Sequence, residues 1–263
     1  MKIGFIGCGN MAGAMIRGIK AADLPFAQEI LASAKTEETK RKIQKDLKIT
    51  CLANSQVAAE ADILFLAVKP LYYAEIIREI REDVKDSALV VSIAPGKTLA
   101  ALEEMFGRRV AIVRAMPNTP AMAGEGMTAY CANSSVTEAQ KQEARQIFES
   151  FGKAEEVPEN LMDVVTAVSG SGPAYIFPVI EAMADGAVLG GMPRSQAYRF
   201  AAQTVLGSAK MVLETGKHPA ELKDMVCSPA GTTIEAVRVL ESRGIRSAFI
   251  EAEKACLDKS RGM

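Results

Sequence analysis

The stretch Lys2–Ala12, KIGFIGCGNMA, decides the fold. Its first five residues are an apolar run that predicts a strand, and apolar side chains recur at helical spacing from Met11 to Ala21. The residues between fit the pattern G-x-G-x-x-G/A, in which one glycine permits a tight turn and the next lets a pyrophosphate approach the backbone. The stretch therefore predicts a dinucleotide site with contacts from Gly7, Cys8, Gly9, Asn10 and Met11.

Strand and helix patterns alternate through the first half of the chain. The run Ala61–Val68 is almost wholly apolar, as a strand buried on both faces should be. Further strands are expected at 30–33, 88–93, 110–115 and 126–131, and helices at 36–47 and 72–82. This alternation predicts parallel βαβ units with right-handed crossovers, and hence a Rossmann-type doubly wound sheet.

After residue 158 the pattern becomes helical, without a clear strand. Helices are expected at 160–168, 174–190, 195–215, 219–226, 232–242 and 245–259. We therefore expect an α/β chain with a dinucleotide-binding domain over 1–158 and an all-helical dimerisation domain over 159–263. The segment 174–189 is apolar nearly all round, and such a helix must be covered. Its burial predicts a homodimer formed through the helical domain.

The amino-acid composition limits the classes of binding partner and the cellular compartment that we expect. The 31 Lys and Arg residues nearly balance the 32 Asp and Glu residues, which gives no reason to expect nucleic acid or an anionic membrane as partner. Apolar runs fall well short of the ~20 residues of a membrane helix, and no charged leader precedes the first strand. Five scattered cysteines without a CxxC pair indicate reduced thiols in a cytoplasmic protein, and no cluster has metal-ligand spacing.

The turn after the second expected strand bears on which dinucleotide is used. NAD-binding folds usually place an acidic residue about 20 residues beyond the glycine loop, to hold the ribose. Here the segment Ala32–Thr36 has no carboxylate, but it offers hydroxyls and a lysine. These groups suit a 2′-phosphate, so we expect NADPH, with NADH as the alternative and with contacts from Ser33, Lys35 and Thr36. The competing interpretation of Lys35 is a solvated loop charge.

Five later segments carry a more specific pattern. They are Ala67–Pro70, Ser92–Gly96, Met116–Pro120, Ser169–Tyr175 and Ser228–Thr233. In this order they resemble the pyrroline-5-carboxylate reductase family, over essentially the whole chain. The resemblance implies reduction of 1-pyrroline-5-carboxylate to L-proline, the last step of proline biosynthesis. It also implies a helical domain that interlocks with a second subunit, with higher homo-oligomers as an extension, and a substrate pocket there that faces the nicotinamide.

The resemblance also assigns residues. Cofactor contacts are expected from Asn54, in the loop before the apolar strand, and from Ala67, Val68, Lys69, Pro70, Ala94, Pro95, Gly96 and Asn118. Substrate contacts are expected from Glu159, Ser228, Gly231, Thr232 and Thr233. Thr233 is the catalytic candidate because its hydroxyl can donate and accept towards the ring nitrogen. The competing interpretation is an empty helix start, where Ser and Thr are common. Ala230 stands where the family commonly has glycine.

Two other functions remain open from the sequence. A different NADP-dependent imine or β-hydroxyacid reductase has the same architecture, but β-hydroxyacid dehydrogenases typically carry a catalytic lysine on the helix after the glycine-serine motif. That helix begins Pro173–Phe177 here, without lysine, and alcohol oxidation without a base is hard to achieve. The second alternative is a non-catalytic dinucleotide sensor, which fold alone does not exclude.

Overall fold

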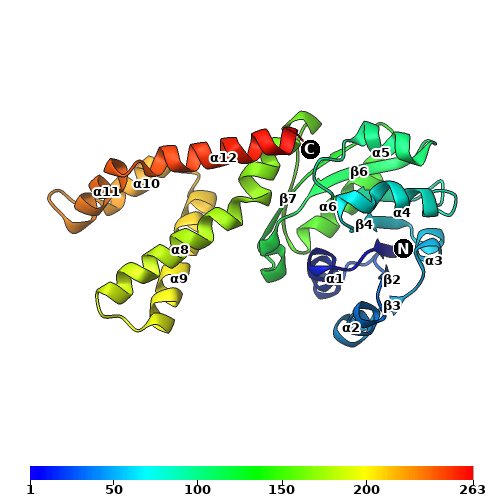
Figure 1. The fold of residues 1–263 in the computed structure, drawn as a ribbon, viewed down its shortest axis with the longest axis horizontal. Coiled ribbons are helices and arrows are strands. Elements are labelled where there is room, and N and C mark those ends of the chain that lie inside the picture. Colours follow the sequence, from blue (N-terminus) through cyan, green and yellow to red (C-terminus); the bar gives the residue numbers. More distant parts are fainter. Residues whose placement is uncertain (263) are drawn as a thin grey trace. The chain divides into compact units, whose positions relative to one another are not determined.

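The computed structural model describes residues 1–262 and divides into two compact units (Figure 1). The first unit comprises Met1–Ser171 together with the segment that begins at Cys256, and the second comprises Gly172–Ala255. The first is an α/β unit and the second is helical, which confirms the expected fold class. Each unit is described by itself below.

An eight-stranded sheet forms the centre of the first unit, in the order β3-β2-β1-β4-β5-β6-β7-β8. The strands are β1 (Lys2–Ile6), β2 (Glu29–Ser33), β3 (Thr50–Cys51), β4 (Ile63–Leu66), β5 (Leu89–Ser92), β6 (Ala111–Met116), β7 (Gly126–Ala132) and β8 (Gly152–Glu156). From β1 to β6 all neighbouring strands are parallel. The chain reverses its direction of travel across the sheet between β1 and β4, and ligands of such sheets bind at the carboxyl ends beside that point.

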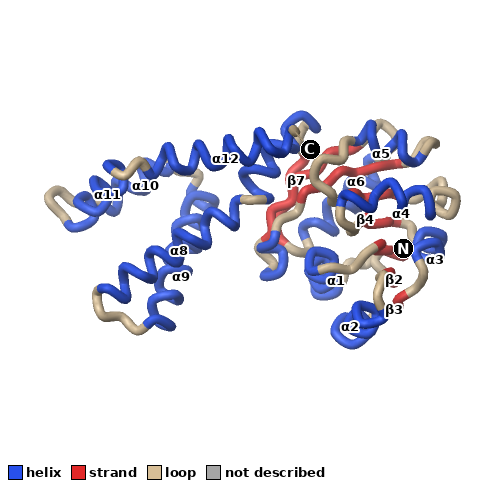
Figure 2. Tube along the Cα trace, in the orientation of Figure 1, coloured by secondary structure: helices blue, strands red, loops and turns tan. Residues whose placement is uncertain are grey.

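Helices cover both faces of this sheet (Figure 2). They are α1 (Asn10–Ala22), α2 (Glu37–Leu47), α3 (Asn54–Glu60), α4 (Tyr73–Ile80), α5 (Leu99–Phe106) and α6 (Glu138–Glu149). On one face α1, α2 and α6 pack over Phe5 and Phe65, whose rings stack with centroids 4.7 Å apart. On the other, α3, α4 and α5 pack over Leu64 and Val90. Burial of strands on both faces explains their continuous apolar sequence.

The parallel part of the sheet, as predicted from the alternation of strands and helices, ends at β6. Strand β7 pairs with β6 in the antiparallel sense, and β8 pairs with β7 in the parallel sense. The connection from β6 to β7 contains only the short 3-10 helix η2 (Thr119–Ala123). A parallel return needs a crossover of about a dozen residues or more, so this short connection returns the chain antiparallel.

The two compact units divide after Ser171. The domain boundary expected after residue 158 stays a prediction. The intervening residues form η3 (Glu159–Leu161), α7 (Met162–Val165) and a π-helical turn (Thr166–Gly170). Met162 is buried in the core of the first unit. Near the end of α12 (Ile245–Arg261), the Ser260 hydroxyl donates to the Asp163 carboxylate at 3.0 Å, and this contact ties the C-terminal segment to the same unit.

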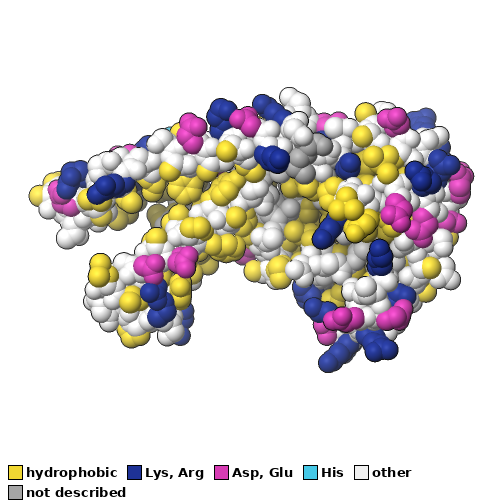
Figure 3. Space-filling view, in the orientation of Figure 1, with side chains coloured by type: hydrophobic (Ala, Val, Ile, Leu, Met, Phe, Trp, Pro, Cys, Tyr) yellow, Lys and Arg dark blue, Asp and Glu magenta, His cyan; other side chains and the backbone are white. Residues whose placement is uncertain are grey.

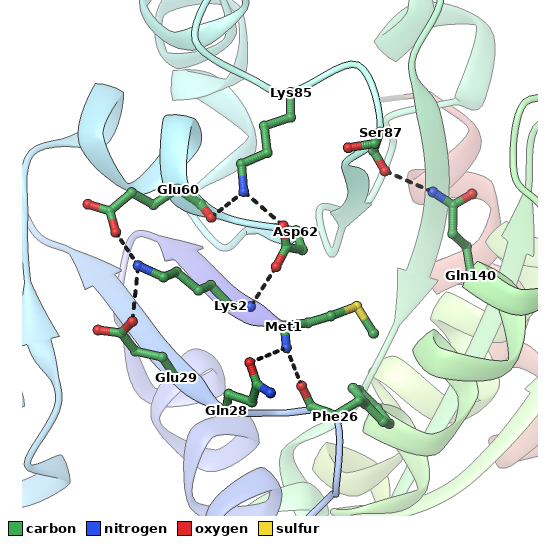
Figure 4. A network of polar contacts seen from close by, with 10 residues as sticks. All are labelled: Met1, Lys2, Phe26, Gln28, Glu29, Glu60, Asp62, Lys85, Ser87 and Gln140. Carbon is green, nitrogen blue, oxygen red and sulfur yellow. Dashed lines mark hydrogen bonds and ion pairs between the residues drawn. The ribbon is translucent and has the colours of Figure 1, made fainter.

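A polar network closes the amino ends of β1, β2 and β4 (Figure 4). The Lys2 backbone N–H donates to Asp62 Oδ2 at 2.8 Å, and Lys2 Nζ lies 2.6 Å from Glu60 and 3.1 Å from Glu29. Lys85 Nζ lies 2.8 Å from Asp62 Oδ1. These contacts fix the sheet at the edge opposite the glycine loop.

The second unit has little interior of its own. Besides part of α12 it contains α8 (Gly172–Leu189), α9 (Arg194–Thr215), α10 (Pro219–Val226) and α11 (Thr232–Ser242). Its buried cluster consists of three alanines, Ala184, Ala197 and Ala201. Large apolar side chains are exposed instead, including Leu189 at 91% and Leu213 at 82%, and Figure 3 shows hydrophobic side chains gathered over α8. Among residues 1–262, none of the helices has the length and apolar character to span a bilayer.

Candidate active site

The glycine loop leaves room for a phosphate. Gly7 has φ +84, and a Cβ there would lie 2.7 Å from Val68 Cγ1 and 2.9 Å from the Ala67 carbonyl oxygen. Gly9 is the N-cap of α1 and supplies no side-chain cap, and a Cβ at this position would meet nothing within 4 Å. Gly7 is therefore required by the protein itself, whereas the space before Gly9 is open. An open, uncapped helix N-terminus fits a pyrophosphate.

A cavity of about 860 Å³ extends from this loop. It brings together predicted contacts from four separate segments, namely Gly7, Cys8, Gly9, Ser33, Lys35, Thr36, Asn54, Ala67, Val68 and Lys69. These segments meet because β1, β2 and β4 are parallel neighbours with their carboxyl ends at one edge. The size and the lining fit an elongated dinucleotide better than a small metabolite.

A chain of hydrogen bonds organises the wall of the cavity. The Ser33 hydroxyl donates to Asn54 Oδ1 at 2.6 Å and accepts from the Gly7 N–H at 3.4 Å, and Asn54 Nδ2 donates to Glu79 Oε2 at 3.0 Å. Ser33 is only 2% exposed, so its hydroxyl stabilises the glycine loop from the protein interior and not from the cavity. Asn54 is the first residue of α3, which corrects its predicted placement in a loop.

Basic and hydroxyl groups gather where the second strand ends. Lys35 Nζ lies 5.5 Å from the centroid of the Tyr72 ring, a cation–π contact that holds the ammonium at the cavity. Thr36 is the N-cap of α2 and accepts from the Thr39 N–H at 3.2 Å. Lys40 also lines the cavity, 2.7 Å from Glu37. Two ammonium groups beside a helix N-terminus fit a 2′-phosphate.

The remaining predicted cofactor residues lie outside the lining of this cavity. They are Asn10, Met11, Pro70, Ala94, Pro95, Gly96 and Asn118. Their segments nevertheless follow or flank the carboxyl ends of β1, β4, β5 and β6.

The buried side chain of Tyr73 connects the carboxyl ends of β4 and β5. Its hydroxyl donates to the Leu66 carbonyl at 2.6 Å and accepts from Ser92 Oγ at 3.2 Å. Burial raises the pKa of Tyr73 to about 12, so the phenol stays protonated.

Asn118 is 8% exposed and is bonded on both sides of its amide. Its Nδ2 donates to the Ser169 carbonyl at 3.2 Å and to Ser169 Oγ at 3.3 Å, while Oδ1 accepts from the Met127 N–H at 2.8 Å. The side chain therefore fixes the loop after β6. Its contact with a cofactor stays a prediction.

The segment Ser228–Thr233 is a tight turn followed by an uncapped helix. The Gly231 N–H donates to the Ser228 carbonyl at 3.1 Å, and Gly231 is the N-cap of α11 without a side-chain cap. Ala230 has φ +56, the left-handed conformation that glycine favours, so the alanine keeps the turn despite its Cβ. A Cβ on Gly231 would lie 2.3 Å from Ser228 Oγ. Thr232 and Thr233 thus occupy the first turn of a helix whose N–H groups are available for an anion.

Glu159 has a different setting from the other predicted substrate residues. Its Oε1 accepts from the Leu99 N–H at 2.7 Å and from Arg114 Nη1 at 3.2 Å. Both partners belong to the first unit. Contact of Glu159 with substrate stays a prediction.

Cysteine and metal chemistry contribute little to the described site. Burial, with a smaller effect of Cys51, raises the pKa of the Cys8 thiol to about 11, which keeps it protonated and unreactive. Across residues 1–262, His, Cys, Asp and Glu side chains form no group of three or more that would hold a metal ion.

Several cavity residues were not predicted from the sequence. They are Ala34, Thr39, Lys40, Leu52, Ala53, Tyr72, Glu75, Ile76 and Glu79. Lys40 carried a signal, since it lies one helical turn after Thr36 at the start of an expected helix. Glu79 carried none, because only the packing of α4 beside α3 brings it to the cavity. Tyr72 ends the short 3-10 helix Pro70–Tyr72, which directly follows the predicted segment Ala67–Pro70.

Comparison with known proteins gives consistent matches over the whole chain. The family described as "Pyrroline-5-carboxylate reductase dimerisation" matches residues 159–263, and "NADP oxidoreductase coenzyme F420-dependent" matches residues 2–96. Pyrroline-5-carboxylate reductase of Escherichia coli is 50% identical over 98% of this chain and 97% of its own. That of Methanosarcina acetivorans is 46% identical over 99% and 97%. The crystal structure of Plasmodium falciparum pyrroline carboxylate reductase with NADP bound superposes with a TM-score of 0.90 at 32% identity, over 100% of this chain and 97% of the other.

Proposed function

The chain belongs to the pyrroline-5-carboxylate reductase family, and we propose that it reduces 1-pyrroline-5-carboxylate to L-proline with NADPH as hydride donor. It is accordingly an NAD(P)-dependent oxidoreductase acting on a C=N bond. The observation in the structure that carries this proposal is the open start of α11, where Gly231 caps without a side chain and two threonines follow. Such a helix end suits a small substrate with one carboxylate and one polar ring atom.

The dinucleotide is assigned to the cavity of the first unit. The Gly9 end receives the pyrophosphate at the start of α1, and Lys35 with Lys40 receives the 2′-phosphate. Both ammonium groups act as point charges, so their attraction to a phosphate weakens as salt rises. NADPH is favoured over NADH because the turn after β2 provides cations and hydroxyls, while the carboxylates that line the cavity come from α4.

The substrate is assigned to Ser228, Gly231, Thr232 and Thr233. When bound, the reduced nicotinamide supplies a hydride to the imine carbon. The backbone N–H groups at the start of α11 bind the substrate carboxylate, and the Thr233 hydroxyl holds the ring nitrogen as it becomes an amine. A protonated imine is already electrophilic, so orientation of the ring is the main task of these residues. Glu159 remains a candidate contact.

A second copy of the chain is the proposed partner of the helical unit. The buried cluster of that unit consists of three alanines, while Phe177, Phe200 and Leu213 are 63%, 58% and 82% exposed. Apolar surface of this extent indicates an interface, and the family match over 159–263 is described as a dimerisation region. We propose a homodimer through this unit, with higher homo-oligomers built from it. Neither nucleic acid nor membrane is proposed as partner. The five cysteines are all free, which supports a cytoplasmic location.

The test is an absorbance assay at 340 nm with 1-pyrroline-5-carboxylate and either NADPH or NADH, on the wild type, Thr233→Ala and Thr233→Ser. We expect faster turnover with NADPH. Thr233→Ala should lower kcat/KM by about 10²-fold, with partial recovery in the serine variant, because loss of one hydrogen bond to a transition state costs roughly this much. Comparable circular dichroism spectra would serve as the folding control. NADPH binding without turnover in the wild type would favour a sensor or a different substrate.

A further inference from the structure

Arg114 is a buried cation within the sheet of the first unit. It lies on β6 and is 4% exposed, on the face that also buries Ile112. A guanidinium removed from water requires anionic partners, because an unpaired buried charge is strongly destabilising. The acidic side chains paired with Arg114 therefore indicate which segments of the chain it holds in place.

Two carboxylates flank the guanidinium. Arg114 Nη1 lies 3.2 Å from Glu159 Oε1, and Nη2 lies 3.9 Å from Asp163 Oδ1. Both belong to the segment of η3 and α7, in the same unit as Arg114. The two carboxylates differ, however, in their second hydrogen-bond partner. Asp163 accepts from the Ser260 hydroxyl of α12, whereas Glu159 accepts from the Leu99 N–H at 2.7 Å.

Leu99 is the first residue of α5, directly after the N-cap Thr98. It follows the β5–α5 loop, which contains the predicted cofactor contacts Ala94, Pro95 and Gly96, and Gly96 has φ +71. A carboxylate at the start of α5 satisfies a backbone donor and interacts favourably with the helix dipole. Glu159 therefore fixes the position of Leu99, where the β5–α5 loop ends, and Arg114 holds the Glu159 carboxylate in place.

We propose that Arg114 and Glu159 are positioning residues for the β5–α5 loop, which they hold in the conformation that receives the dinucleotide. This role rests on the proposed use of NADPH. It gives Glu159 a role on the cofactor side through Leu99, separate from its predicted contact with substrate. Asp163 shares the same arginine but bonds to α12, so it provides a matched control.

The experiment measures NADPH affinity by fluorescence titration and hydrogen exchange in the peptide covering residues 93–99, for wild type, Glu159→Ala, Glu159→Gln and Asp163→Ala. Glu159→Ala should weaken NADPH binding about tenfold and speed exchange at the Leu99 amide, which loses its acceptor. Glu159→Gln keeps an oxygen acceptor and should recover part of both. Asp163→Ala should stay within about twofold of wild type in affinity, even where its melting temperature falls.

Equal losses of NADPH affinity in Glu159→Ala and Asp163→Ala would overturn the proposal, because they would reflect general loosening around Arg114. Unchanged affinity and exchange in Glu159→Ala would overturn it as well. Neither measurement uses turnover. A wild-type chain that binds NADPH but does not reduce 1-pyrroline-5-carboxylate would therefore contradict the proposed reaction and leave the positioning role of Arg114 and Glu159 unaffected.

Discussion

Asn118 and Ser169 join two motifs that lie 51 positions apart in the sequence. The amide of Asn118, in the loop after β6, donates to both the carbonyl and the hydroxyl of Ser169 in the π-helical turn before α8. The other side of the amide accepts from the Met127 N–H at the start of β7. One buried side chain thus connects three segments of the first unit.

Asn118→Ala should destabilise the first unit by about 2 kcal/mol, since the Met127 N–H and the Ser169 groups lose a buried partner. Ser169→Ala removes only the hydroxyl acceptor and should cost no more than about 1 kcal/mol. Urea unfolding followed by circular dichroism measures both free energies. A loss below about 0.5 kcal/mol for Asn118→Ala would mean that water replaces the amide and that the link contributes little.

Ala230→Gly should stabilise the chain slightly. A non-glycine residue at φ +56 costs about 1–2 kcal/mol, and glycine removes this strain at a smaller entropic cost in the unfolded chain. Ala236→Gly is the matched control, because Ala236 is an exposed alanine inside α11 and its replacement should destabilise by about 1 kcal/mol. Thermal unfolding should give opposite signs for the two substitutions. The same sign for both would indicate that the turn carries no strain.

The sequence predicted those elements whose apolar pattern is set by burial. Strands β1, β4 and β5 are buried on both faces, so each appears as a continuous apolar run. Strand β8 was missed because it is an edge strand with the sequence GKAEE, largely exposed and without an apolar pattern. Strand β3 has only two residues, too few for any periodicity. The antiparallel direction of β7 depends on the length of its connection and not on its own residues.

At the site, the motifs identified the segments but not the partners of each side chain. Ser33 was predicted as a phosphate contact, yet its hydroxyl bonds to Asn54 and Gly7 within the wall. Glu159 was predicted from family resemblance, whereas its bonds to Leu99 and Arg114 depend on chain segments 60 and 45 positions away. Long-range contacts of this kind leave no local signal in one sequence.

Alkylation of Cys8 should depend on pH as expected for a thiol with a raised pKa. Burial raises this pKa to about 11, so roughly one thiol in a thousand is ionised at pH 8. The rate with iodoacetamide should rise about tenfold per pH unit from pH 8 to 10, since the thiolate is the nucleophile. A cysteine in a short unstructured peptide with blocked ends should level off near the ordinary thiol pKa of about 8.5. Mass spectrometry of the Cys8 peptide follows the reaction, and saturation near pH 8.5 would show that the thiol is ordinary.

Asp62 should make stability depend on pH at the acidic side. Burial alone would raise the pKa of this carboxyl, but hydrogen bonds from Lys85 and the Lys2 N–H, with the charges of Lys85 and the N-terminus, outweigh it and lower the pKa below its usual value. A lowered pKa means that the unfolded chain binds more protons than the folded one as the pH falls. The stabilisation is therefore complete above the ordinary Asp pKa of about 3.9 and is lost as the pH falls through the lower folded value.

Asp62→Asn should accordingly melt below the wild type by several degrees at pH 7, and the gap should narrow as the pH approaches 3. Below the ordinary Asp pKa of about 3.9 the unfolded chain takes up a proton before the folded chain does, so the wild type loses the stabilisation that Asp62→Asn already lacks. Asp86→Asn is the control: its carboxylate is 99% exposed beside Arg108, and a pair of this kind contributes less than about 1 kcal/mol. Calorimetry between pH 3 and 7 measures both differences. A difference in melting temperature between wild type and Asp62→Asn that stays constant with pH would show that the packing and hydrogen bonds of Asp62, and not its charge, account for its stabilisation.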